Sequence, residues 1–499
     1  MNTLLVLPIL IPFLMAILSI INWGNRVLHR FLALAGSVGL LFAALALLTT
    51  VSEQGILSSN TGDWPAPFGI VLVADLPGAI MVLMAAIVGL AVLVYSTASL
   101  DEARERFGYY PLILILLMGM CGAFLTGDLF NLYVWFEIML IASFALLALG
   151  GSRAQLEGSV KYFALNLLVS AFFLTGIGFL YGMTGSLNMA ALAQALRAAG
   201  PEQPVTTVAI FFMIAFGIKA AMFPLYFWLP ASYHTPPVAV SAIFAGLLTK
   251  VGVYAMIRMF TLLFVQDTAW THGLLLVGAA LTMLSGVLGA VARREIRRIL
   301  SFNIISHIGY IVLGLALYRP LALAGAWLYL IHHVIVMATL FLVSGIVQRV
   351  GGSFRLARLG GLYQRHPGLA LLFLLPALAL SGVPPLSGFW PKLVLLQAML
   401  QDGLWLLAAI ALLVSLLTLF SMMRIWVGAF WSQAPAGVVT PAPMASVERR
   451  MLYGPVLALL ALTIAISVFS GPAFELTQRA AEQLLNPQQY IVAVLGESP

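Results

Sequence analysis

The chain has 499 residues, of which 62% are hydrophobic and only 8% are charged, and its mean hydropathy is +1.06. This composition leaves too few polar side chains to cover a soluble globule, so the sequence predicts a polytopic membrane protein. The net charge of +7 does not indicate nucleic-acid binding, because membrane topology explains where the basic residues lie. The single Cys121 lies inside an apolar segment, which excludes a disulfide framework.

A helix needs about 20 mainly apolar residues to cross the hydrocarbon core, and about 14 such segments follow one another along the chain. The predicted spans are residues 3–21, 31–50, 77–97, 109–126, 129–149, 160–181, 205–229, 238–260, 271–291, 297–317, 321–347, 368–400, 403–430 and 453–472. The first segment lacks the basic start and cleavage site of a signal peptide, so it is expected to be retained. Because ten-residue alternating segments are missing, the predicted fold class is all-α, not a transmembrane β-barrel.

The loops between these segments differ strongly in basic residues. Odd-numbered loops hold sixteen: Arg26, Arg30, Arg104, Arg106, Arg153, Lys161, Arg293, Arg294, Arg297, Arg298, Arg349, Arg355, Arg358, Arg365, Arg449 and Arg450. Even-numbered loops and the tail hold four: Arg197, Arg258, Arg319 and Arg479. The positive-inside rule therefore places the odd loops in the cytoplasm and both termini outside, as an even number of spans requires.

A few charges remain inside the predicted spans. The chain has only four lysines, and three of them, Lys219, Lys250 and Lys392, lie within spans; Arg424 lies near the cytoplasmic end of its span and can snorkel. Glu137 is the acidic residue closest to mid-span, whereas Asp128 lies close to a helix end. A charge at mid-bilayer costs at least ~2.5 to 3.5 kcal/mol, so these residues indicate a transport function, with a structural ion pair as the alternative.

The choice of lysine is informative. Burial lowers the pKa of a lysine toward the physiological range, whereas arginine stays charged. A buried lysine can therefore release its proton, and three such lysines favour proton transfer along the membrane.

Histidines in two further spans are candidates for the same transfer. His332 and His333 lie near the centre of the segment LIHHVIVMATLF, and His307 shares a predicted helix face with Asn303, Ser306 and Tyr310. Imidazole donates on one nitrogen and accepts on the other, which suits a proton relay. Adjacent helical residues point about 100° apart, so only one of the paired histidines is expected to face the relay, and His332 is favoured.

Two spans are interrupted by prolines. Pro224 follows Lys219, and Pro384, Pro385 and Pro391 precede Lys392. Such breaks at membrane depth are tolerated inside protein or beside a watery cavity. They fall in spans seven and twelve, and an offset of five helices predicts two inverted five-helix repeats. The predicted organisation is residues 1–108 (helices 1–3), 109–260 and 271–430 (the repeats), and 431–499 (helix 14 and a tail).

The layout of these charges and breaks resembles the antiporter-like subunits of respiratory complex I, membrane-bound hydrogenases and Mrp-type cation/proton antiporters, over residues of about 70 to 430. The resemblance implies a polar axis through Glu137, Lys219, Lys250, His332 and Lys392, in which the glutamate pairs with the first lysine. Asp128, His307 and His333 are secondary relay candidates. Half-channels are implied near the two broken helices.

Longer segments narrow the resemblance to the D subunits of the Mrp-type family. They are LLVLPILIPFL, WPAPFGIVLVADLPGAIMVL and FWLPASYHTPPVAVSAIFAGLLTKVGVYAMIRMFTLLF. The resemblance implies an ion-translocating subunit of a multisubunit Na+ (or other monovalent cation)/H+ antiporter in a bacterial cytoplasmic membrane. Its partners would be the A, B, C, E, F and G subunits, the two ions and the lipid bilayer, with no cofactor and no metal.

Three alternatives remain open on the sequence. The chain is also compatible with a proton-pumping subunit of complex I or a hydrogenase, which would count as a translocase subunit. A solute symporter would not need charges in five spans, and an inert scaffold would not need three mid-membrane lysines. A soluble-type enzyme is not indicated, because nucleotide loops, metal clusters and nucleophile triads are missing from the sequence.

Overall fold

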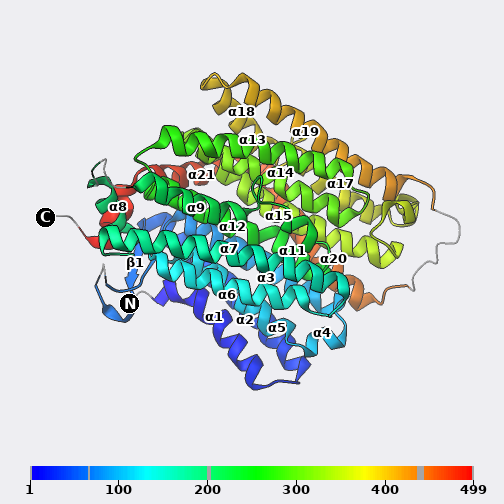
Figure 1. The fold of residues 1–499 in the computed structure, drawn as a ribbon. Helices are drawn as coiled ribbons and strands as arrows, with labels where there is room; N and C mark the ends of the chain where they lie inside the picture. Colours follow the sequence, from blue (N-terminus) through cyan, green and yellow to red (C-terminus); the bar gives the residue numbers. More distant parts are fainter. Residues whose placement is uncertain (1–2, 66–67, 199, 201–203, 435–442, 497–499) are drawn as a thin grey trace.

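The computed structural model describes residues 3–65, 68–198, 200, 204–434 and 443–496. Residues 66–67, which belong to one of the segments quoted above, and 435–442, which belong to the last predicted region, lie outside the described residues. The described chain is mostly helical, and its long helices run side by side from one end of the molecule to the other (Figure 1).

Eleven helical stretches in the described residues are long and apolar enough to cross a membrane. Nine are single helices: α1 (Thr3–Ile21), α2 (Arg26–Gln54), α3 (Leu76–Ser99), α6 (Leu129–Ala148), α7 (Arg153–Thr184), α13 (Thr268–Ala292), α14 (Ile296–Leu317), α15 (Pro320–Gly351) and α20 (Ser446–Val468). Two contain a π-helical turn: α11 (Val238–Ile243) and α12 (Thr249–Leu262) flank Phe244–Leu248, and α19 (Trp405–Ile425) continues into Trp426–Trp431. Three shorter apolar helices are α5 (Tyr109–Leu125), α9 (Val205–Ala220) and α17 (Pro367–Ser381).

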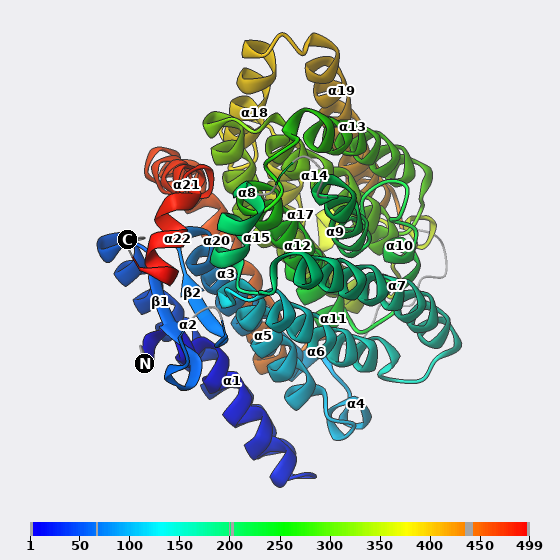
Figure 2. The same ribbon diagram turned by 60° about the vertical axis from the view of Figure 1, so that its left-hand side comes forward.

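The helices form a core and a periphery. The α11–α12 stretch, α14 and α15 are buried along their apolar lengths, and α15 contacts α14, α3, α17 and α20. Peripheral helices expose large apolar side chains, such as Val27 and Phe31 on α2 and Leu406 on α19. In Figure 2, α1 and the α18–α19 pair project from opposite sides of the bundle. Exposed apolar side chains on peripheral helices are what lipid contact requires.

Both predicted helix breaks are present, and they have the same spacing. Helix α9 ends at Ala221, which has a left-handed backbone (φ 61°), Pro224 follows, and α10 (Trp228–Ser232) continues the span. Helix α17 ends at left-handed Gly382 (φ 84°), Pro385 follows, and α18 (Phe389–Gln401) continues it. In each case the proline comes three residues after the left-handed residue and the second helix begins seven residues after it.

One end of the molecule carries structure that the all-helical expectation missed. Strands β1 (Leu57–Asn60) and β2 (Val71–Ala74) form an antiparallel hairpin, and β2 contains two β-branched residues, Val71 and Val73, which favour a strand. The tail folds into α21 (Ser470–Leu485) and α22 (Pro487–Leu495), which pack on α15, on β1 and on α8 (Met189–Ala198). Helix α1 begins and α22 ends at this same end (Figure 1).

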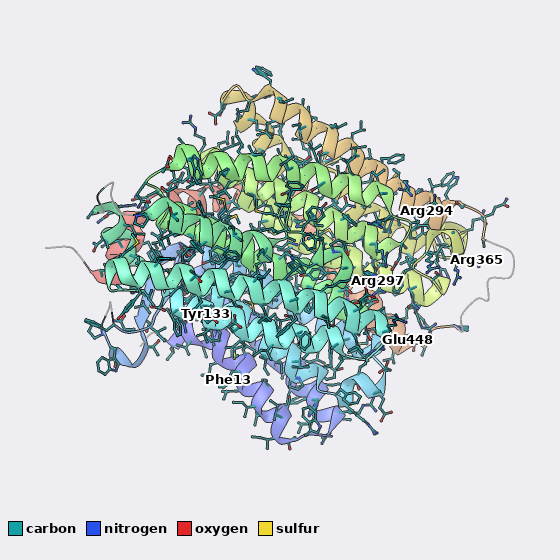
Figure 3. The ribbon with its side chains drawn as sticks, in the orientation of Figure 1. Phe13, Tyr133, Arg294, Arg297, Arg365 and Glu448 are labelled. Atoms are coloured by element: carbon teal, nitrogen blue, oxygen red, sulfur yellow. The ribbon has the colours of Figure 1, made fainter. Side chains whose placement is uncertain are left out.

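The opposite end carries most of the basic loops. It includes α4 (Glu102–Arg106), α16 (Leu362–Arg365) and the 3-10 turn Leu356–Arg358. Figure 3 shows Arg294, Arg297 and Arg365 together at this end, next to Glu448, which pairs with Arg349 at 2.7 Å. Arg258 is an exception to the expected loop assignment. It lies inside α12, where it is 7% exposed, because it has a buried partner.

Candidate functional site

Lys219 lies in the last turn of α9, just before the helix break, and is 2% exposed. Its Nζ donates to Oδ1 of Asn166 on α7 at 3.0 Å and lies 5.5 Å from the centre of the Phe136 ring and 5.9 Å from that of Tyr162. The ammonium is therefore held by a neutral amide oxygen and two aromatic rings.

Glu137 on α6 is expected from the resemblance to pair with Lys219. The structure places it close enough for its charge to act on Lys219, but within the described residues the two form no ion pair at 4.0 Å or less. The carboxylate instead accepts a hydrogen bond from the hydroxyl of Ser170, one turn beyond Asn166 on α7. Helix α7 packs on both α6 and α9, and each of the two charges is bonded to a polar side chain of α7.

Lys250 lies in the first turn of α12, directly after the π-helical turn, and is 0% exposed. Its Nζ donates to the backbone oxygen of Ala245 within that turn. A π-helical turn disturbs the regular ladder of backbone hydrogen bonds and leaves a carbonyl for a side chain. The local fold therefore supplies a neutral acceptor for the buried ammonium.

Three histidines follow on α14 and α15. His333 and His307 stack with ring centres 5.3 Å apart and planes 11° apart, and the Nδ1 of His307 bonds to the hydroxyl of Tyr329. His333 interacts electrostatically with both Lys250 and Lys392, and His332 interacts with Lys392. Both histidines of the pair are therefore within electrostatic range of Lys392, and His333 is also within range of Lys250.

Lys392 is the last residue of the expected polar axis and lies in the second broken span. Its Nζ donates to the backbone oxygens of Leu380 at 3.2 Å and Ser381 at 3.0 Å, at the end of α17, and lies 5.0 Å from the centre of the Tyr310 ring. The end of a helix leaves carbonyls without partners, and the lysine uses two of them. His332 bonds through Nδ1 to Oγ of Ser387, in the segment between the half-helices, at 2.8 Å.

The prolines predicted at the breaks differ in position. Pro224, Pro384 and Pro385 lie between the half-helices, whereas Pro391 lies in the first turn of α18, where a missing N–H costs no helical hydrogen bond.

Asp128 is the N-cap of α6 and accepts from the backbone N–H of Asn131 at 2.7 Å. Burial raises the pKa of this carboxyl above its usual range. Its side chain caps the helix and bonds to none of the relay lysines and histidines among the described residues, which agrees with its place at a helix end. Over all the residues that the structure describes, no group of three or more metal-ligating side chains is found.

A buried ion pair escaped the sequence analysis. Oδ2 of Asp75, the N-cap of α3, lies 2.5 Å from a guanidinium nitrogen of Arg258, and their side chains are 3% and 8% exposed. The guanidinium lies between the rings of Tyr254 and Tyr490, at 5.5 and 5.2 Å from their centres. The spacing of Lys250, Tyr254 and Arg258 at every fourth residue on α12 is a signal that could have placed Arg258 on an inward face.

Two broken spans, with lysines and histidines on and between them that are mostly buried, define the class of antiporter-like, ion-translocating membrane proteins. The chain belongs to the NADH:quinone oxidoreductase/Mrp antiporter family, whose model matches residues 126–418.

Relatives narrow this assignment. The D subunit of the Na(+)/H(+) antiporter of Alkalihalophilus pseudofirmus is 45% identical over 497 residues, covering 100% of both chains. A chain of the Mrp complex from Dietzia sp. DQ12-45-1b has a TM-score of 0.91 at 33% identity, over 99% of this chain and 100% of that one. A chain of respiratory complex I from Thermus thermophilus has a TM-score of 0.81 at 26% identity, over 96% of this chain and 99% of that one. Within the family, the chain groups with the antiporter D subunits.

Proposed function

We propose that this chain is the ion-translocating D subunit of a multisubunit Na+/H+ antiporter and moves protons along Glu137, Lys219, Lys250, the histidines and Lys392. The observation that carries the proposal is a set of three lysines within the helix bundle, none of which has a carboxylate ion-pair partner among the described residues; Lys219 and Lys250 are buried and Lys392 is partly buried. A buried charge kept only for stability normally has an opposite charge beside it. The greater similarity to antiporter D subunits than to the complex I chain favours antiport over the respiratory alternative.

The three histidines supply the proton-transfer step between Lys250 and Lys392. Nε2 of His307, Nε2 of His332 and both ring nitrogens of His333 are buried and have no hydrogen-bond partner among the described residues. Buried polar groups are nearly always paired, so such a concentration of free nitrogens fits groups that exchange protons with one another or with water. A proton leaving Lys250 would pass to His333 and His307, and His332 would deliver it to Lys392.

The proposal also covers the number of membrane spans, the two repeats, the orientation in the membrane and the partner subunits. Fourteen spans follow from the eleven long and three shorter apolar helices, and the matched spacing of the two breaks supports inverted repeats within residues 109–260 and 271–430. Basic loops at one end and the chain ends at the other support a bacterial cytoplasmic membrane orientation with both termini outside. The A, B, C, E, F and G subunits are the proposed partners, and the chain is a secondary-transporter subunit.

The test is Lys219→Arg in the assembled complex, assayed by Na+-dependent dissipation of a pH gradient in everted vesicles. Arginine keeps the charge but does not release its proton, so we expect assembly without transport. The matched control is Lys161→Arg, because Lys161 is an exposed lysine on α7 whose partner is Glu157. Wild-type transport in the Lys219→Arg complex across a pH series would show that Lys219 carries no proton.

A further inference from the structure

Helix α7 contributes two polar side chains to the part of the proposed proton path formed by Glu137 and Lys219. Neither side chain was a candidate from the sequence. Asn166 contacts Lys219, and Ser170 contacts Glu137, so each charged group is bonded to α7 and not to the other. The two residues are one turn apart, and the Ser170 hydroxyl also lies 3.2 Å from the backbone oxygen of Asn166. They form two adjacent polar contacts on one face of α7.

The amide of Asn166 has a fixed orientation. Its Nδ2 donates to the backbone oxygen of Tyr162 at 2.8 Å, which leaves Oδ1 as the atom that faces Lys219. Asn166 is 1% exposed, so water does not compete freely for this oxygen. The amide is therefore a dedicated acceptor for the Lys219 side chain.

We propose that Asn166 and Ser170 are positioning residues that hold Lys219 and Glu137 apart, and that Lys219 exchanges between the Asn166 oxygen and the Glu137 carboxylate during transport. This inference rests on the proposed function. It assigns the described arrangement to the separated state of the pair, and it names the groups that stabilise that state.

The chemistry of the two acceptors explains why the exchange matters. An amide oxygen accepts a hydrogen bond from the ammonium and also from the neutral amine, whereas a carboxylate strongly favours the ammonium. When Lys219 is on Asn166, one N–H bond of Nζ breaks and the proton leaves toward Lys250. The resulting amine keeps its hydrogen bond to Oδ1 through another N–H. Return of Lys219 to Glu137 favours reprotonation.

The first test is Asn166→Asp, which places a permanent carboxylate at the acceptor position with little change in volume. We expect transport in everted vesicles to fall about 10-fold or more at neutral pH, which corresponds to about 1.4 kcal/mol. The pH optimum should move to higher pH, because Lys219 then holds its proton more tightly. An unchanged pH profile would overturn the proposal.

A second set of variants covers the case in which Asn166→Asp does not assemble. Asn166→Ala leaves only Glu137 as an acceptor, and Ser170→Ala frees the carboxylate to reach Lys219, so both should shift the optimum to higher pH. Adding Glu137→Gln to Ser170→Ala should cancel that shift. The control is Ser159→Ala, since Ser159 is a buried serine of α7 whose hydroxyl donates to the backbone oxygen of Gln155, away from both charges.

The outcomes separate this inference from the proposed function. If Lys219→Arg abolishes transport while the Asn166 and Ser170 variants keep the wild-type pH profile, only the positioning role is wrong. If the variants lose rate in proportion to the amount of complex assembled, with no shift in optimum, the two residues are merely structural and the inference is also wrong. Wild-type transport by Lys219→Arg overturns both.

Discussion

The Asp75–Arg258 ion pair should be one of the most important polar contacts for the stability of this chain. Both side chains are almost fully buried, their atoms approach to 2.5 Å, and the guanidinium also donates to the hydroxyl of Tyr254 at 3.1 Å. Breaking a buried pair costs about 3 to 5 kcal/mol, because the remaining charge loses its partner. Asp75→Asn is the cleanest perturbation, since asparagine keeps the N-cap acceptor for the N–H of Gly78.

The expected loss of unfolding free energy is judged by comparison with an exposed ion pair that has the same separation. Arg106 and Glu102 also lie 2.5 Å apart, and Arg26 lies 2.8 Å from the same carboxylate; because the side chain of Glu102 is 53% exposed, Glu102→Gln should cost at most about 1 kcal/mol. Asp75→Asn should therefore lower the free energy of unfolding several times more than this control. The double variant Asp75→Asn with Arg258→Met should recover most of the loss, because no unpaired charge remains.

The chain provides its own reporter for this measurement. Cys121 is the only cysteine and is 0% exposed, so its reaction with a thiol dye in detergent reports unfolding as temperature rises. Equal midpoint shifts for Asp75→Asn and Glu102→Gln, or a double variant less stable than either single change, would refute the reasoning.

Three further predictions test the topology, the need for partner subunits and the protonation state of a histidine in the turn after α10. In a Cys121→Ala background, a cysteine at Ser353 should be shielded from an impermeant thiol reagent in intact cells, while one at Gln488 should react; the reverse pattern contradicts the orientation. The isolated subunit should not exchange Na+ for protons in vesicles, and Na+-dependent dissipation of a pH gradient by this chain alone would contradict the need for other subunits. The pKa of His234 is lowered to about 4 by burial and by the charges of Arg298 and Arg297, so the imidazole is neutral at pH 6 to 8 and charges only as pH falls toward 4. His234→Gln should therefore leave the pH profile of transport unchanged between pH 6 and 8, and a shifted optimum would show that His234 titrates there.

The helix breaks, and the place of three lysines inside apolar helices, could be predicted from the sequence because prolines and lysines are rare in apolar segments. Lys219, Lys250 and Lys392 stand out against lipid-compatible neighbours, and prolines in mid-span mark the interruptions that the structure contains at Pro224 and Pro385. These signals are local. They need no knowledge of which helices are neighbours.

What the sequence did not predict depends on contacts between distant segments. Asp75 and Arg258 are far apart in the chain, and Asn166 and Ser170 are ordinary polar residues in an apolar helix until α6, α7 and α9 are packed together. The contacts of the paired histidines also depend on packing, because His333 stacks on His307 of α14 and His332 bonds to Ser387 in the second broken span.

Four cations within the helix bundle differ in the kind of oxygen to which they donate. Lys219, Lys250 and Lys392 each donate to a neutral oxygen: an amide side chain, a carbonyl of a π-helical turn, or carbonyls at a helix end. Arg258, which is 7% exposed, lies against a carboxylate. Neutral oxygens accept from both the charged and the uncharged lysine, so the protonation state remains free to change, whereas the carboxylate holds a permanent charge in place. Among these four cations, the neutral acceptors of the lysines fit the proposed proton transfer, whereas the carboxylate beside Arg258 fits a role in stability.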